Sequence, residues 1–85
     1  MIAEHKIVST MAEDLDTSHP LWAERINVDK LDMLSACYCI AGQLHEDWVQ
    51  LANEIAERTG LDYGDAQNGF AGSVEDWYLA IDARL

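Results

Sequence analysis

Basic residues are scarce in this chain. Only five of its 85 residues are Lys or Arg, whereas sixteen are Asp or Glu, so the formal net charge is -11 at pH 7. A protein that binds nucleic acid directly neutralises phosphates with clustered Lys and Arg. A protein that attaches to an anionic membrane surface also needs basic residues. The composition therefore argues against direct nucleic-acid binding and against membrane attachment.

Cysteines and long apolar runs are also scarce. The two cysteines, Cys37 and Cys39, are separated by one residue, a spacing that suits neither a helix nor a strand for a disulfide between them. Two cysteines without a disulfide framework are typical of a reducing compartment. No segment approaches the 18 apolar residues of a membrane span, and the N-terminus shows no signal-peptide pattern. We therefore expect a cytoplasmic protein.

The chain does have enough apolar residues for a folded core. Hydrophobic residues make up 49% of it, and they include three Trp, three Tyr and one Phe. This content disfavours disorder, and the length fits a single domain over residues 1–85. We expect Trp22, Trp48 and Trp77 to be mostly core anchors, and any exposed one to be a contact residue. Because so small a core has modest stability, a homodimer stays open.

The spacing of apolar residues predicts an all-α fold. Helices are expected over residues 3–15, 21–26 and 74–85, and no segment sustains the alternation of a strand. Residues 61–72 contain three glycines and predict a loop, or a short helix over 62–70. Ser73 begins a capping pattern ahead of the last helix.

The central stretch, residues 28–59, carries the strongest pattern. On a helical wheel its apolar residues fill one half, and their helical spacing continues without a shift through Gly42. This predicts one long helix, or two nearly collinear ones, that begins after Asn27 and ends at Gly60. The rival interpretation is a helical hairpin bent near Gly42. The predicted architecture is thus a small helical bundle packed on a long central helix, with a capped C-terminal helix.

Acidic residues of the same stretch share a sector opposite its apolar half. Carboxylates three or four residues apart on a helix lie about 5–6 Å apart at Cβ, comparable to the phosphate spacing of a nucleic-acid strand. Such a row would be attracted to a protein whose groove is lined with Lys and Arg. The alternative is a solubilising face, as in a salt-adapted protein. The candidate partner-binding residues are Asp29, Asp32, Glu46, Asp47, Glu54 and Glu57.

Motifs for catalysis, cofactors and metals are not found. The sequence has no phosphate-binding loop, no dinucleotide-binding fingerprint and no nucleophile elbow. Its three His and two Cys lack the spacing of a zinc site. A nucleophilic cysteine needs electropositive surroundings, which this acidic chain does not supply. We therefore expect neither an enzyme nor a cofactor or metal site.

One spacing resembles the helix-turn-helix of phage repressors. Ala56, Gly60 and Ala66 stand where that motif has a small residue, a turn glycine and a packing residue, and the resemblance covers residues 51–72. The would-be recognition helix departs from the motif, because it carries Asp62 and Asp65 and no Lys or Arg. DNA would repel such a helix. The geometry is therefore expected to serve packing instead.

In overall character the chain resembles the small acidic inhibitors that phages and other mobile elements encode, among them anti-CRISPR proteins and nucleic-acid mimics. The resemblance rests on small size, acidity, helical content and the lack of catalytic motifs. It implies a non-enzymatic, stoichiometric inhibitor that occludes the basic nucleic-acid-binding surface of a partner complex. The alternative is a helical interaction or dimerisation module, antitoxin-like or regulatory, that makes contact through apolar and Trp residues.

Overall fold

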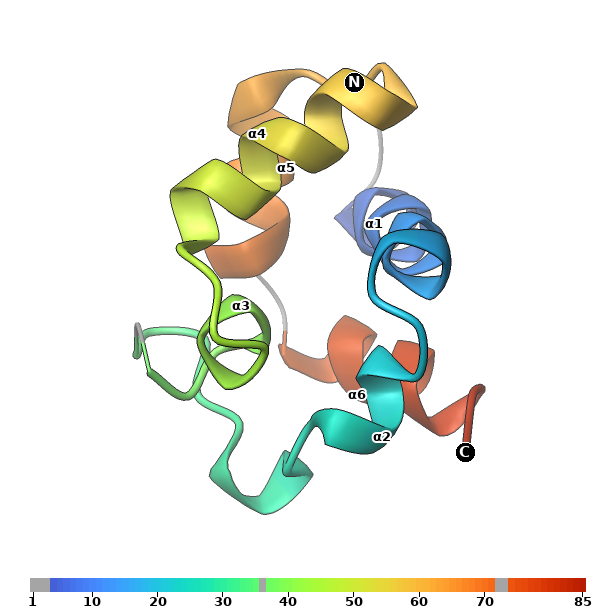
Figure 1. Cartoon of the computed structure of the whole chain (residues 1–85), viewed down its shortest axis with the longest axis vertical. Helices are drawn as coiled ribbons and strands as arrows, with labels where there is room; N and C mark the ends of the chain where they lie inside the picture. Colours follow the sequence, from blue (N-terminus) through green and yellow to red (C-terminus); the bar gives the residue numbers. More distant parts are fainter. Residues whose placement is uncertain (1–3, 36, 72–73) are drawn as a thin grey trace.

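The computed structural model describes residues 4–35, 37–71 and 74–85. Over these residues the structure contains α-helices, one 3₁₀ helix and no β-strand, so the predicted all-α class is confirmed. Figure 1 shows the helices arranged around a common core. The elements in chain order are α1 (Glu4–Ser18), α2 (Trp22–Arg25), η1 (Val28–Lys30), α3 (Ile40–Gln43), α4 (Trp48–Thr59), α5 (Tyr63–Ala71) and α6 (Val74–Asp82).

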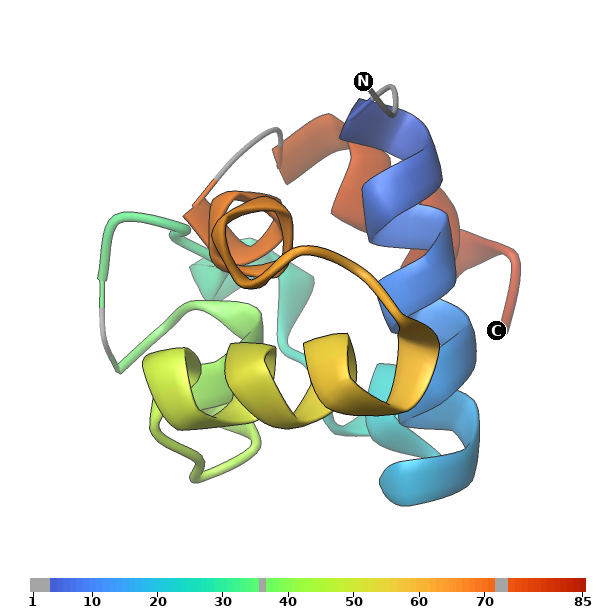
Figure 2. The same ribbon diagram turned by 90° about the horizontal axis from the view of Figure 1, so that it is seen from above.

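The N-terminal helix α1 makes its main contacts with three other helices. It packs against α4, α5 and α6, and Figures 1 and 2 both show it beside them. Its apolar residues recur every three or four positions, so they form one stripe that faces the core. The buried residues of this stripe are Ile7, Val8, Met11, Ala12 and Leu15.

The predicted long helix over residues 28–59 is wrong. The chain there forms η1, an irregular segment, the single turn of α3 and then α4. Each short element has its own N-terminal cap: Asn27 Oδ1 accepts the Asp29 N–H, Cys39 Sγ accepts the Gly42 N–H, and Asp47 caps α4. His45 breaks the path between α3 and α4 with a left-handed φ of 63°. The rival prediction, a helical hairpin bent near Gly42, comes closer to the structure. The left-handed residue, His45, lies a few residues after Gly42.

The side chain of Gln43 holds the irregular segment in place. Its amide nitrogen donates to the carbonyl oxygens of Tyr38 at 3.0 Å and Asn27 at 3.2 Å. Its amide oxygen accepts the backbone N–H of Asn27 at 2.7 Å. These bonds take the place of helical backbone bonds that the segment does not form. The segment can therefore bury Leu31 and leave Leu34 exposed, although the wheel placed both on one apolar face.

Aromatic rings join α2, α5 and α6 inside the core. Trp77 packs edge-on against Trp22, with ring centroids 5.8 Å apart, and stacks on Phe70 at 5.6 Å. The Trp77 indole N–H donates to the Gly69 carbonyl at 2.7 Å, so its polar atom is satisfied although the residue is buried. Trp22 and Trp77 are thus confirmed as core anchors, whereas Trp48 packs on the edge of the core and is partly exposed.

The C-terminal helix α6 begins at Val74 and buries Trp77 and Ile81. The predicted cap at Ser73 lies outside the described residues. Tyr78 and Leu85 are 40% and 72% exposed. This end of the molecule therefore presents apolar side chains to solvent.

Candidate partner-binding surface

The six predicted acidic residues do not form one helical row, because the helix that would align them is interrupted. Asp29 belongs to η1 and Asp32 to the irregular segment after it. Glu46 and Asp47 lie in the turn before α4, and only Glu54 and Glu57 share a helix. The structure therefore places them in separate regions of the fold. Their role in binding a partner stays a prediction.

Three of these carboxylates have local structural roles. Asp47 is the N-cap of α4, since its Oδ1 accepts the backbone N–H groups of Val49 at 3.0 Å and Gln50 at 3.1 Å. Asp32 accepts the backbone N–H of Leu34 at 2.9 Å in the irregular segment. Glu46 Oε1 lies 3.3 Å from Nε2 of His19, which follows α1. These groups shape turns, and replacing Asp47 would disturb α4 itself.

The helix-turn-helix spacing corresponds to two real helices joined by a short turn. At the end of α4, Gly60 adopts a left-handed φ of 80° and its N–H donates to the Ala56 carbonyl at 2.9 Å. Ala56 and Ala66 are buried at 2% and 0% exposure, which lets α4 and α5 pack closely. Figure 2 shows α4 lengthwise and α5 nearly end-on, so the two helices are strongly inclined.

Four carboxylates surround this turn: Glu54, Glu57, Asp62 and Asp65, here named the turn acids. Asp62 Oδ1 accepts the Gly64 N–H at 2.8 Å and so caps the start of α5. Glu57 accepts the Tyr63 hydroxyl at 3.1 Å, and this hydrogen bond is the main reason that the pKa of Tyr63 is raised. Glu57 and Asp62 are exposed, whereas Glu54 and Asp65 are partly exposed.

The one Lys or Arg of the α4–turn–α5 unit, Arg58, is paired with a carboxylate of α1. Arg58 Nη2 donates to Asp14 Oδ2 at 2.8 Å, and its Nε donates to Asp14 Oδ1 at 3.1 Å. This ion pair with α1 raises the pKa of Arg58, and the nearby Glu54 and Glu57 contribute further. Arg58 thus forms its ion pair with Asp14, while Glu54 and Glu57 lie near enough to interact with its charge.

A second ion pair uses Arg84 in the same way. Arg84 Nε donates to Asp16 Oδ1 at 2.7 Å, and the Trp22 indole N–H donates to the same oxygen at 2.9 Å. These bonds, chiefly the one from Arg84, hold the pKa of Asp16 below its ordinary value. The guanidinium also lies over the Trp22 ring, 5.6 Å from its centroid. Two of the five basic side chains, Arg58 and Arg84, thus form ion pairs within the protein.

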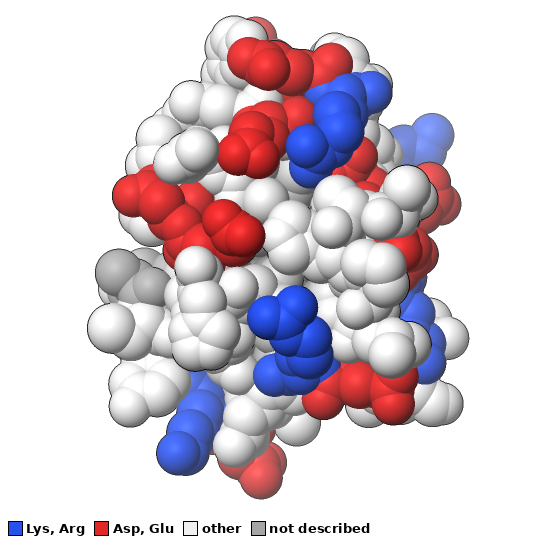
Figure 3. Space-filling view, in the orientation of Figure 1, with Lys and Arg blue, Asp and Glu red and all other residues white. Residues whose placement is uncertain are grey.

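Figure 3 shows how the charges are distributed over one face. Acidic side chains gather over the upper part of the view, where Figure 1 places α4, and basic side chains lie among them and below.

Among the described residues, no group of three or more His, Cys, Asp or Glu is close enough to hold a metal ion. None of the described helices has the length and apolar character needed to cross a bilayer.

No protein family, curated protein or solved structure matches this chain. Its own surface is therefore the evidence for its function.

The sequence did not predict two features of that surface. The pairing of Arg58 with Asp14 joins residues that are far apart in the chain, so no local pattern predicts it. The exposure of Tyr78, within α6, and of Leu85, beyond its end, was not predicted from the apolar spacing either.

Proposed function

We propose that this protein is a non-enzymatic binding protein that occupies the basic nucleic-acid-binding surface of a partner through its α4–turn–α5 unit. The observation that carries the proposal is the pairing of Arg58, the one Lys or Arg of the unit, with Asp14, so that Arg58 forms its ion pair with α1 and not with a turn acid. Carboxylates in excess over basic side chains on a folded scaffold attract a groove lined with Lys and Arg and speed association with it.

The position of these acids within the unit supports a basic partner. In a DNA-binding helix-turn-helix, the N-terminal residues of the second helix contact the bases. Here that part of the unit carries Asp62 and Asp65, with Glu57 hydrogen-bonded across to Tyr63. Phosphates would repel these groups, whereas Arg and Lys side chains would pair with them. The surface is thus suited to compete with nucleic acid.

Contact through tryptophan side chains, the alternative mode, has less support. Trp22 and Trp77 are 1% and 0% exposed, and each indole N–H already has an acceptor inside the protein. Only Trp48 is partly exposed. The tryptophans therefore serve chiefly as core residues.

A pair of charge-matched variants tests the proposal. In the first, Glu54→Lys and Glu57→Lys reverse two turn acids, and Asp47 and Asp62 are left intact because they cap helices. In the second, Glu24→Lys and Glu75→Lys reverse two exposed acids on α2 and α6. Both variants have the same net charge. Each would be immobilised beside the wild type and used to capture proteins from the source cells, followed by elution with duplex DNA or with RNA.

The proposal expects a captured protein that binds the wild type and the Glu24/Glu75 variant, is lost from the Glu54/Glu57 variant, and is eluted by nucleic acid. Equal loss from both charge-reversed variants would mean that the acidity acts only through net charge. A captured protein that nucleic acid does not displace would contradict occlusion of a nucleic-acid-binding surface. Circular dichroism of each variant would confirm that the helices are retained.

A further inference from the structure

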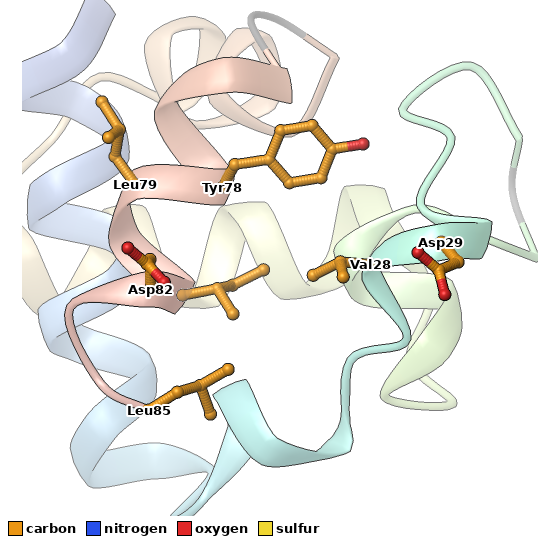
Figure 4. Close-up of a pocket in the computed structure, with 7 residues that line it drawn as sticks. Val28, Asp29, Tyr78, Leu79, Asp82 and Leu85 are labelled. Atoms are coloured by element: carbon orange, nitrogen blue, oxygen red, sulfur yellow. The ribbon is translucent and has the colours of Figure 1, made fainter.

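A groove lies between α6 and η1, on a different part of the molecule from the turn acids. Its volume is about 390 Å³, within the range of ligand-binding pockets in proteins. Figure 4 shows Tyr78 and Leu85 on the α6 side and Val28 on the η1 side. The buried side chain of Ile81, which is 1% exposed, also lines the groove.

The groove gathers much of the exposed apolar surface. Among the described residues, four of the nine exposed large apolar side chains line it, namely Val28, Tyr78, Leu79 and Leu85. Leu79 and Leu85 are 69% and 72% exposed. Clustered apolar side chains with this exposure are typical of an interaction site, whereas a single exposed leucine is ordinary.

The charged residues that line the groove are both acidic. Its lining includes Asp29 from η1 and Asp82 from α6, and no Lys or Arg. In Figure 4 the two carboxylates lie toward opposite ends of the groove, with Val28 between Asp29 and the α6 side. An occupant with apolar side chains in the middle and cations at its flanks would match both features.

We propose that this groove binds an amphipathic helix of another protein, one whose apolar stripe is flanked by Lys or Arg. Apolar side chains at i, i+3, i+4 and i+7 of such a helix would enter between Val28 and Leu85. Its cations would lie near Asp29 and Asp82. This site is separate from the acidic face of the proposed function and does not depend on it.

A second copy of the chain fits the groove poorly. Each copy has a formal net charge of -11, so two copies repel each other. In a two-fold dimer the same patch would meet itself, which would place Asp29 and Asp82 against the acids and apolar residues of the same groove. A basic amphipathic helix removes this repulsion, and charge complementarity therefore selects it as the occupant.

The test uses a fluorescein-labelled peptide of about 14 residues that places Leu at i, i+3, i+4 and i+7 and Lys elsewhere. Fluorescence anisotropy would measure its binding to the full chain at physiological salt. Val28→Ser with Leu85→Ser removes apolar side chains from both sides of the groove. Leu34→Ser with Val49→Ser is the matched control, because both residues are exposed and neither lines this groove. A peptide with Glu in place of Lys tests the sign of the charge.

The proposal expects the Val28/Leu85 variant to weaken binding about tenfold or more, since a buried leucine contributes that much. The matched control should change affinity less than about threefold. Asp29→Asn with Asp82→Asn should weaken binding more than Glu54→Gln with Glu57→Gln, which removes the same charge elsewhere. Equal effects of the paired variants, or equal binding of the Glu peptide, would overturn the proposal. A wild-type dimer in sedimentation that is lost in the Val28/Leu85 variant would assign the groove to a second copy instead.

Discussion

The guanidinium of Arg58 forms a bidentate ion pair with the carboxylate of Asp14, at 2.8 Å from Nη2 and 3.1 Å from Nε. The pair joins the end of α4 to α1, which also packs against α5 and α6. It also commits the guanidinium of the one Lys or Arg of the α4–turn–α5 unit to α1, although its charge still acts on the nearby Glu54 and Glu57. One contact therefore serves both the packing of the helices and the charge of the proposed binding surface.

Asp14→Asn should separate these two effects. The substitution weakens the ion pair, so we expect the free energy of unfolding to fall by about 0.5–1 kcal/mol, because the Arg58 side of the pair is partly exposed. The released guanidinium can then turn to Glu54 and Glu57, which lowers affinity for a basic partner. Urea unfolding measures the first effect and titration of the partner measures the second. Glu24→Gln has the same net charge and should leave affinity unchanged; an equal loss there would contradict the explanation.

Acid should weaken the fold in part through Asp16. Its pKa is lowered in the folded state from an ordinary 3.8, so its stabilising contribution is complete above pH 3.8 and is lost as the pH falls below that value. In Asp16→Asn this dependence should be absent. The difference in unfolding free energy between wild type and variant should be largest near neutral pH and should shrink toward pH 2.5. A difference that stays constant over this range would contradict the role of Asp16.

Gln43→Glu tests how the irregular segment is held. The carboxylate cannot donate to the carbonyls of Asn27 and Tyr38, so we expect a loss of about 1–2 kcal/mol in unfolding free energy. Amide hydrogen exchange should quicken in residues 27–39 and much less in α1. The control, Gln50→Glu on the exposed side of α4, should cost less than about 0.5 kcal/mol. Equal destabilisation by both would show that the added charge, and not the lost donors, is responsible.

Two glycines of α5 should respond oppositely to alanine. A Cβ at Gly69 would collide with the buried Met11 Sδ and lie 3.1 Å from Ile7 Cγ2, so Gly69→Ala should cost about 1–3 kcal/mol. A Cβ at Gly64 would meet only Asp62 Oδ1 at 3.2 Å, and alanine favours the helix, so Gly64→Ala should change stability by less than about 1 kcal/mol. Thermal unfolding of both variants measures the contrast. A stabilised Gly69→Ala protein would mean that α1 and α5 are less closely packed than described.

The sequence predicted α1 and α6 well because their apolar residues recur at helical spacing and are buried on one face. It failed between residues 28 and 47 because a helical wheel records apolar periodicity and not interruptions of the backbone. Ile40 and Ala41 are buried there, in a short turn of helix that follows an irregular segment. Asn27 was predicted as a cap, but Asp47 was predicted only as a contact residue, and the left-handed backbone of His45 has no signal in its residue type.

The candidate surface was predictable only in part. The excess of acidic over basic residues follows from the sequence alone. Which of the acidic residues cap helices depends on where the helices begin, and the prediction placed those starts wrongly. Asp47 thus changes from a candidate contact to a structural residue. The ion-pair partner of Arg58 depends on how α4 packs against α1, which no local sequence pattern predicts.

The salt dependence of partner affinity, compared between two variants of equal net charge, decides whether the turn acids contact the partner. With a partner identified by capture, Kd would be measured from low to high salt for wild type, for Glu54→Lys with Glu57→Lys, and for Glu24→Lys with Glu75→Lys. We predict that only the Glu54/Glu57 variant loses affinity, by about tenfold or more at low salt. Its Kd should also depend less on salt than the Kd of the wild type. Identical Kd values and salt dependence for the two variants would contradict this prediction.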